Sequence, residues 1–126
     1  MRWKKRQGRL IVQVDGGIGA TAQAAGLGVV VRDERGRILQ VWHKQDRRQT
    51  NVEAEYRALI WGLEIVRQNL PAEVHVFSDS EVMVNQMTGR FLVHSPELKI
   101  LHREACVLAT AFDRVLFTYI PRELNC

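Results

Sequence analysis

The sequence predicts one α/β domain: a mixed five-stranded sheet with helices on its faces and elements in the order βββαβααβ. Two observations support this fold class. Apolar residues first alternate along the chain as in strands, and after about residue 50 they recur with helical spacing. Apolar segments of strand length and helix length then follow one another, so the later strands are joined by crossover connections. With 126 residues, the whole chain is large enough for one domain with its own core.

The first three strands form a predicted antiparallel meander. The first strand is Leu10–Gly17, a run rich in β-branched residues that ends in two glycines. The second strand is Gly26–Val31, and the third is Arg37–His43. Asp-Glu-Arg-Gly at positions 33–36 predicts a hairpin turn, in which Gly36 takes a positive φ angle. We expect loops over residues 18–25 and 45–49.

The first helix is predicted over Asn51–Asn69. Thr50 is a suitable N-cap, and Glu53 follows three residues later, which matches a capping box. Pro71 ends the helix. Its buried face comprises the apolar residues at helical spacing, which are Tyr56, Leu59, Ile60, Leu63, Val66 and Leu70.

The rest of the chain predicts a strand, two helices and a last strand. These are a strand over Val74–Phe77, a helix from Ser78 to about Met87, a helix that begins at Ser95 and Pro96, and a strand over Arg114–Ile120. Ser78 and Glu81 match a capping box, and Ser95 followed by proline is typical of a helix start.

Three carboxylates stand out against this pattern. Asp15 ends an apolar strand, Glu55 lies on the apolar face of the first helix, and Asp79 follows the fourth strand. A charge in apolar surroundings is costly unless it is paired or coordinated, and several carboxylates together are typical of a divalent cation site. Glu53, in contrast, is explained by the capping box and needs no metal. Asp79, taken alone, is also explained as an acidic residue that stabilises the start of a helix.

Composition narrows the class of protein. No apolar run approaches a membrane span, and two cysteines make neither a disulfide framework nor a zinc site, so we expect a cytoplasmic protein. The net charge is +4, and the residues 1–8 form a basic arm that is either an ordinary solvated terminus or a segment that attracts phosphate.

The blocks VDGG, TNVEAEYRALIWGLE, FSDSEVMVNQ and IPRELN together resemble the type 1 ribonuclease H family. The chain is most similar to the short bacterial and archaeal branch, which lacks a basic protrusion before the long third helix. The resemblance implies a ribonuclease H-like fold and an endonuclease that hydrolyses the RNA strand of RNA/DNA hybrids, leaving 3′-hydroxyl and 5′-phosphate ends. It implies two Mg²⁺ ions, for which Mn²⁺ can substitute.

The resemblance also assigns residues. The family's first three catalytic metal ligands match Asp15, Glu55 and Asp79, and Arg122 replaces a histidine that assists catalysis in many members. Substrate contacts are implied at positions matching the family's motifs, which are Gly16, Gly17, Asn51 and Ser80. Val52 stands where a second asparagine is common, and the loop after Gly17 lacks an Asn-Pro-Gly step, so part of the family's substrate contact is absent.

In the family, the fourth metal ligand is an aspartate at the start of a final helix. It follows a few residues after a family asparagine that Asn125 matches, and the sequence given stops at Cys126, before this aspartate. We therefore expect this 126-residue form to be weakly active or inactive. Alternatives are a module that binds hybrid or double-stranded RNA without cutting, a different nuclease or transferase on the same fold, and an ordinary α/β domain. We expect a monomer.

Overall fold

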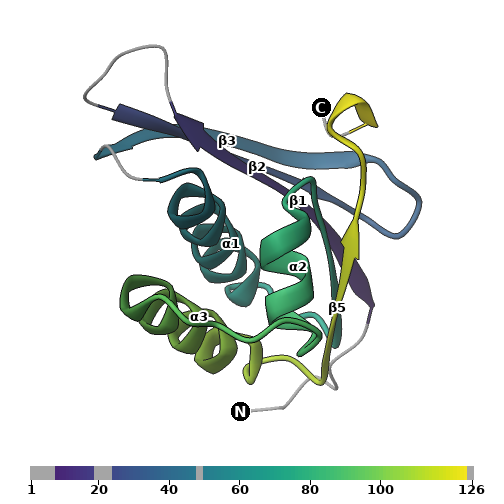
Figure 1. Cartoon of the computed structure of the whole chain (residues 1–126). Coiled ribbons are helices and arrows are strands. Elements are labelled where there is room, and N and C mark those ends of the chain that lie inside the picture. Colours follow the sequence, from purple (N-terminus) through teal and green to yellow (C-terminus); the bar gives the residue numbers. More distant parts are fainter. Residues whose placement is uncertain (1–7, 19–23, 48–49, 125–126) are drawn as a thin grey trace.

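The computed structural model describes residues 8–18, 24–47 and 50–124, which form a five-stranded sheet in the order β3-β2-β1-β4-β5 and three α-helices (Figure 1). The predicted fold class and element order are confirmed. The elements are β1 (Arg9–Ile18), β2 (Ala24–Arg32), β3 (Ile38–Arg47), α1 (Asn51–Arg67), β4 (Glu73–Ser78), α2 (Glu81–Met87), α3 (Pro96–Ala109), β5 (Arg114–Tyr119) and a 3₁₀ turn over Arg122–Leu124. Of the predicted basic arm, residues 1–7 lie outside the described residues, as do Asn125 and Cys126.

The direction of the strands follows the prediction. β1 pairs antiparallel with β2, and β2 pairs antiparallel with β3. β4 is parallel to β1, and β5 is parallel to β4, because helices connect them. The hairpin turn between β2 and β3 contains Gly36 at a φ angle of +85°, as predicted.

The three helices all lie on one face of the sheet, where the sequence had predicted helices on its faces (Figure 1). Val12 and Val14 of β1 point into a single hydrophobic core that includes residues of every described helix. Gly62 of α1 permits the close approach of helix and sheet, since a Cβ there would lie 3.0 Å from Val12 Cγ1. None of the described helices is long and apolar enough to cross a membrane.

The structure corrects three local predictions. Leu70, predicted on the buried face of the first helix, lies beyond the end of α1 at Arg67 and is exposed, because the chain turns there with a φ angle of +44° at Leu70. The second helix is capped by Ser80 and not by Ser78, because Ser78 is the last residue of β4 and pairs with Val14 in β1. The proposed capping box of Ser78 and Glu81 is therefore wrong. β3 continues to Arg47 through part of a predicted polar loop, because it is an edge strand with exposed side chains and so needs no apolar alternation. The capping box at Thr50 and the start of α3 at Ser95 and Pro96 are confirmed.

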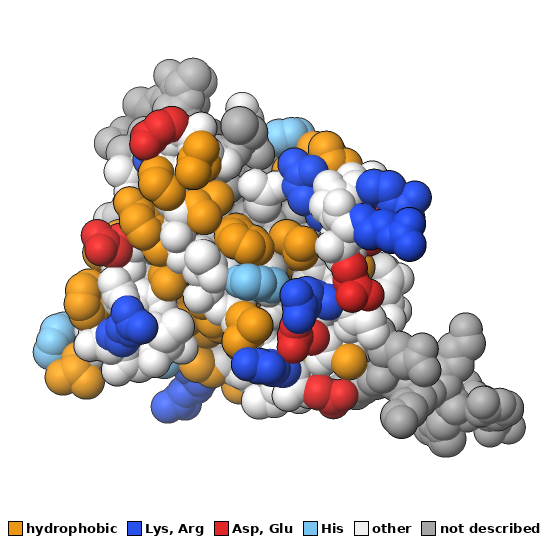
Figure 2. Space-filling model, turned by 90° about the vertical axis from the view of Figure 1, so that its right-hand side faces the viewer, with side chains coloured by type: hydrophobic (Ala, Val, Ile, Leu, Met, Phe, Trp, Pro, Cys, Tyr) orange, Lys and Arg blue, Asp and Glu red, His pale blue; other side chains and the backbone are white. Residues whose placement is uncertain are grey.

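Opposite the helices, the sheet is open. Figure 2 shows the side of the molecule that carries β5 and the hairpin between β2 and β3, with hydrophobic side chains across its middle and basic side chains both at its upper right and along its lower part. The rings of His75 and Phe77 on β4 stack with their centroids 4.3 Å apart, and His75 Nε2 lies 2.7 Å from the Thr118 hydroxyl oxygen on β5. On this face, the side chains of His75, Phe77 and Thr118 thus contact one another over β4 and β5.

Gly16 has a packing role that a substitution tests. A Cβ at this position would lie 2.2 Å from the carbonyl oxygen of Ala54 in α1, so Gly16→Ala must push the helix away from the strand. We expect a loss of about 1–3 kcal/mol or more in the free energy of unfolding, measured in urea. Gly17→Ala is the matched control, because a Cβ at Gly17 comes no nearer than 3.9 Å to a neighbouring atom. Equal stability of the two variants would contradict this account.

Candidate metal centre

Three carboxylates from separate elements meet at one edge of the sheet. Asp15 comes from β1, Glu55 from the start of α1, and Asp79 from the bend after β4, and one carboxylate oxygen of each lies within 4.8 Å of the others. The register explains the meeting of the two aspartates. Val14 pairs with Ser78 in the parallel pair of β1 and β4, so the next residues, Asp15 and Asp79, leave the two strands side by side.

Glu55 is buried, with 5% of its surface exposed. The backbone N–H of Gly16 donates a hydrogen bond to Glu55 Oε1 at 2.9 Å, which fixes the carboxylate over the end of β1. Burial raises the pKa of Glu55 to about 8; the hydrogen bond from Gly16 opposes this shift, while the charges of Asp79 and Asp15 add to it. The charges of the neighbouring carboxylates thus add to the cost that burial imposes on ionising Glu55.

Of the three carboxylates, Asp79 has the surroundings most typical of a residue that binds a metal ion. Its side chain is 2% exposed, and its Oδ1 atom is buried without a hydrogen-bond partner in the described part of the chain. The bend is held by the Ser80 N–H, which donates to Ser78 Oγ at 3.0 Å, and by Ser80 Oγ, which accepts from Met83 N–H at 3.3 Å. A buried oxygen that lacks a donor is costly unless a ligand fills the position.

Asp15 differs from the other two because it is exposed. The sequence suggested a costly buried charge at this strand end, but Asp15 lies on the open face, since Val12 and Val14 alternate with it toward the core. Partial desolvation and the nearby charge of Asp79 still raise its pKa, while the guanidinium of Arg122 lowers it. Asp15 is thus the cluster's contact with solvent.

The donor set fits a divalent cation. All three groups offer carboxylate oxygen, the ligand that Mg²⁺ and Mn²⁺ prefer. A cation would neutralise their mutual repulsion and give Asp79 Oδ1 the partner it lacks. The open side at Asp15 leaves room for water and substrate oxygen, which Mg²⁺ retains in its coordination shell.

Comparison with known proteins gives consistent results. A family model described as reverse transcriptase-like matches residues 13–126. A crystal structure of RNase H1 from Halobacterium salinarum has 30% sequence identity and a TM-score of 0.88, with 94% of this chain and 89% of that chain covered. The chain belongs to the type 1 ribonuclease H family. The motifs had predicted this membership.

Other family members extend the comparison. The N-terminal RNase H domain of Rv2228c from Mycobacterium tuberculosis has 34% identity and a TM-score of 0.88, with 94% of this chain and 86% of that chain covered. LC11-RNase H1, solved in complex with an RNA/DNA hybrid, has 34% identity and a TM-score of 0.86, over 93% and 88% of the two chains. As for length, the chain spans 32% of the whole bifunctional protein Rv2228c, to which it is 35% identical over 93% of its own residues.

The substrate residues implied by the ribonuclease H motifs fall into two groups. Gly17 and Asn51 are neighbours beside the carboxylates, since Asn51 Oδ1 lies 3.9 Å from the position that a Cβ on Gly17 would take. Gly16 and Ser80 are buried and serve the fold: Gly16 donates to Glu55, and Ser80 caps α2. Arg122 is mostly exposed, and its Nε atom lies 3.6 Å from Asp79 Oδ2.

A groove of about 550 Å³ begins at the ribonuclease H carboxylates and crosses the open face over β1, β2 and β3. Its lining includes Asp15 and Arg122 together with residues that the sequence reasoning missed, which are Gln13, Gly26, Gly28, His43 and Gln45. The pattern Gly-x-Gly within a predicted strand was the available indication, because glycine weakens a strand interior.

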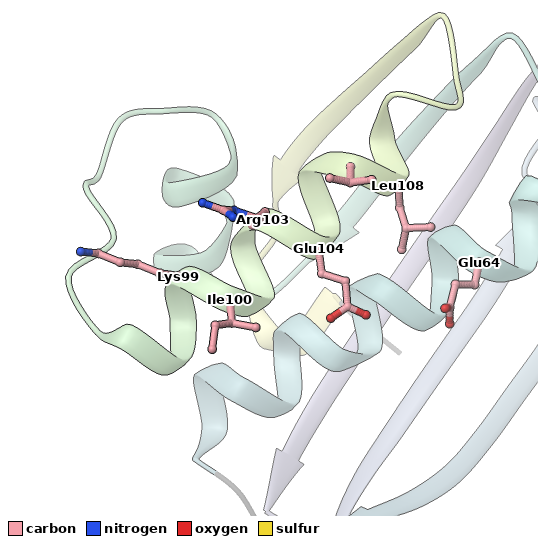
Figure 3. Close-up of a pocket in the computed structure, with 7 residues that line it drawn as sticks. Glu64, Lys99, Ile100, Arg103, Glu104 and Leu108 are labelled. Carbon is pink, nitrogen blue, oxygen red and sulfur yellow. The ribbon is translucent and has the colours of Figure 1, made fainter.

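A larger hollow, of about 640 Å³, lies between α1 and α3 (Figure 3). Ile100, Val107 and Leu108 supply its apolar lining, and Arg103 and Glu104 lie beside them. None of the three carboxylates contributes to this hollow, so it is separate from the metal centre.

The raised pKa of Glu55 predicts how stability depends on pH without metal. A carboxyl with a higher pKa in the folded state contributes stability that is complete below its ordinary pKa of 4.5 and is lost as the pH rises toward about 8. In EDTA, we expect the free energy of unfolding to fall over this range, by on the order of a few kcal/mol.

Glu55→Gln should flatten this dependence, with urea unfolding at several pH values as the measurement; Asp15, whose pKa is also raised, leaves a smaller slope of the same sign. Glu53→Gln is the control, because that half-buried residue belongs to the capping box and lies outside the carboxylate cluster. A wild-type slope in Glu55→Gln would show that this carboxyl is not the source.

Proposed function

We propose that this chain hydrolyses the RNA strand of RNA/DNA hybrids by two-metal-ion catalysis, leaving 3′-hydroxyl and 5′-phosphate ends. The observation that carries the proposal is the meeting of Asp15, Glu55 and Asp79, with a buried Asp79 oxygen that has no partner in the described chain. These residues occupy the positions of the family's catalytic motifs. The hybrid bound to LC11-RNase H1, a relative of similar structure, supports this substrate class.

Asp15, Glu55 and Asp79 would hold the Mg²⁺ ions, which Mn²⁺ can replace. When bound, such ions make a water molecule more acidic and stabilise the charge on a leaving oxygen. The chain's own residues prepare this chemistry. Gly16 orients the Glu55 carboxylate through its N–H, and the buried bend after β4 holds Asp79 in place. The exposed Asp15 completes the site on the side from which substrate arrives.

Arg122 supports phosphate binding and not proton transfer. Its guanidinium is permanently protonated, so it cannot replace the proton-shuttling role of a histidine. It is 83% exposed and lies 3.6 Å from Asp79, where its remaining N–H groups can donate to a phosphate oxygen. We propose that Arg122 holds the scissile phosphate or the product phosphate.

Recognition of the RNA strand is assigned to Asn51 and the backbone at Gly17, which lie together beside the carboxylates. An amide side chain can donate to and accept from the 2′-hydroxyls of the RNA strand, which face a wide and shallow minor groove. Contacts of this kind carry little base information, so we expect weak sequence preference. We also predict a monomer in a cytoplasmic setting, consistent with Cys106 being a free thiol.

Cleavage of a hybrid with a labelled RNA strand tests the function. We expect weak Mg²⁺-dependent cutting of RNA by this 126-residue form, and Asp79→Asn should lower the rate by about a thousandfold or more, because losing a ligand removes several kcal/mol of transition-state stabilisation. Mg²⁺ should also raise the unfolding temperature of the wild-type protein and not that of Asp79→Asn. Hybrid binding without cutting, in the presence of metal, would favour the non-catalytic module.

Arg122→Ala should weaken substrate use without affecting the fold. A hydrogen bond to a charged group contributes about 1.5–3 kcal/mol, so we expect KM to rise about tenfold to a hundredfold. Arg122→Lys should restore part of the loss, since it keeps the charge and loses the forked geometry. Steady-state kinetics with the hybrid measure both. An unchanged KM in Arg122→Ala would contradict phosphate binding by this residue.

A further inference from the structure

We infer that Tyr56 and Gln86 are positioning residues of the metal centre. The hydrogen bond between them fixes α2 against α1, and it thereby sets where Asp79 lies relative to Glu55. This inference rests on the proposed function, since it concerns the same carboxylates. Neither Tyr56 nor Gln86 offers a ligand to the cluster or lines the groove beside it. The assignments drawn from the ribonuclease H motifs include neither of them.

A buried hydrogen bond joins the two helices, which lie side by side on one face of the sheet (Figure 1). The Tyr56 hydroxyl donates to Gln86 Oε1 at 2.6 Å. Tyr56 is 0% exposed and Gln86 is 7% exposed, so water has little access to either partner. A buried polar group without a partner is costly, so the arrangement of the helices that satisfies both groups is strongly favoured. The bond therefore specifies the position of α2 against α1.

Each of these helices holds a carboxylate of the metal centre close to the bond. Glu55 directly precedes Tyr56 on α1. Asp79 directly precedes Ser80, which caps α2. With seven residues, α2 is about 10 Å long, so a shift of the helix at Gln86 reaches the bend that holds Asp79 within about two turns. The distance between the two carboxylates thus depends on where α2 lies.

Gln86 provides the directional contacts of α2 with its neighbouring helices. Among the described residues, the side-chain hydrogen bonds that join α2 to α1 and α3 both involve Gln86: its amide oxygen accepts from Tyr56, and its backbone oxygen lies 3.3 Å from His102 Nε2. The other buried residues of α2, Met83 and Val84, are apolar. Apolar contacts are non-directional and permit small shifts. Without the Tyr56 hydroxyl, α2 loses its directional contact with α1.

Tyr56→Phe tests the inference, because it removes the hydroxyl and keeps the ring in the core. We expect Mn²⁺ to bind about tenfold more weakly in the absence of nucleic acid, since residues that orient metal ligands commonly affect metal affinity by this factor. We also expect kcat for the hybrid to fall about tenfold with little change in KM, because Asp79 acts on the reacting phosphate and not on the rest of the hybrid. Electron paramagnetic resonance of free Mn²⁺ measures the affinity, and steady-state kinetics measures kcat and KM.

Two further variants separate positioning from stability. Val66→Ala removes buried apolar atoms at the far end of α1, so it should lower the unfolding temperature and keep the wild-type Mn²⁺ affinity. Tyr56→Phe combined with Gln86→Met replaces both polar partners with apolar groups of similar size, which removes the unsatisfied amide. We expect this double variant to regain unfolding temperature while Mn²⁺ binding stays about tenfold weaker, since apolar packing does not fix the position of α2.

The outcomes distinguish this inference from the proposed function. Wild-type Mn²⁺ affinity and kcat in Tyr56→Phe would overturn the inference and leave the function intact. Affinity that recovers together with stability in the double variant, or that falls equally in Val66→Ala, would show a purely structural role and also overturn it. Weaker Mn²⁺ binding in both Tyr56 variants, with no cleavage by the wild-type protein, would support the inference and overturn the catalytic proposal. Absence of Mn²⁺ binding by the wild-type protein would overturn both.

Discussion

The carboxylate cluster of Asp15, Glu55 and Asp79 depends on the contact between Gly16 and the first turns of α1. The helix backbone at Ala54 comes so close to β1 that any side chain at Gly16 would collide with it. This closeness lets the Gly16 N–H reach the carboxylate of Glu55, and the Thr50 cap fixes where the helix begins. The parallel register of β1 and β4 then brings Asp79 beside Asp15. One glycine and one register thus position all three carboxylates.

This arrangement is unfavourable for the protein without a cation. Glu55 is buried and lies close to two other carboxylates, and its raised pKa expresses the cost of ionising it there. The rest of the fold tolerates the cost through one continuous hydrophobic core beneath the site, which includes Val12 and Val14 from β1 and Leu59 and Leu63 from α1. The unfavourable charges are therefore concentrated at the position where we propose that metal and substrate bind, as is common at functional sites.

The sequence predicted the fold class and all three carboxylates because each departs from a strong local pattern. Glu55 interrupts an apolar helix face, and Asp15 and Asp79 follow apolar strands. The cap of α2 was misassigned because Ser78 and Ser80 both suit an N-cap, and only the pairing of Ser78 with β1 and β5 decides between them. The exposure of Asp15 could not be predicted either, since it depends on which face the helices leave open. The groove also requires the register that sets His43 opposite Gly28.

Two glycines of the sheet, Gly16 and Gly26, differ in what a Cβ at each position would meet. At Gly16 a Cβ would collide with the backbone of α1, so the protein itself accounts for the glycine. At Gly26 a Cβ would meet open space, in a strand where a β-branched residue would be more stable. Among the described residues, no side chain packs against that position. The two positions lie in adjacent strands at the same edge of the sheet, one beneath the carboxylates and one beside them. The first glycine lets α1 approach β1, and the second keeps the opposite face of the sheet low beside the carboxylates, where the groove lies.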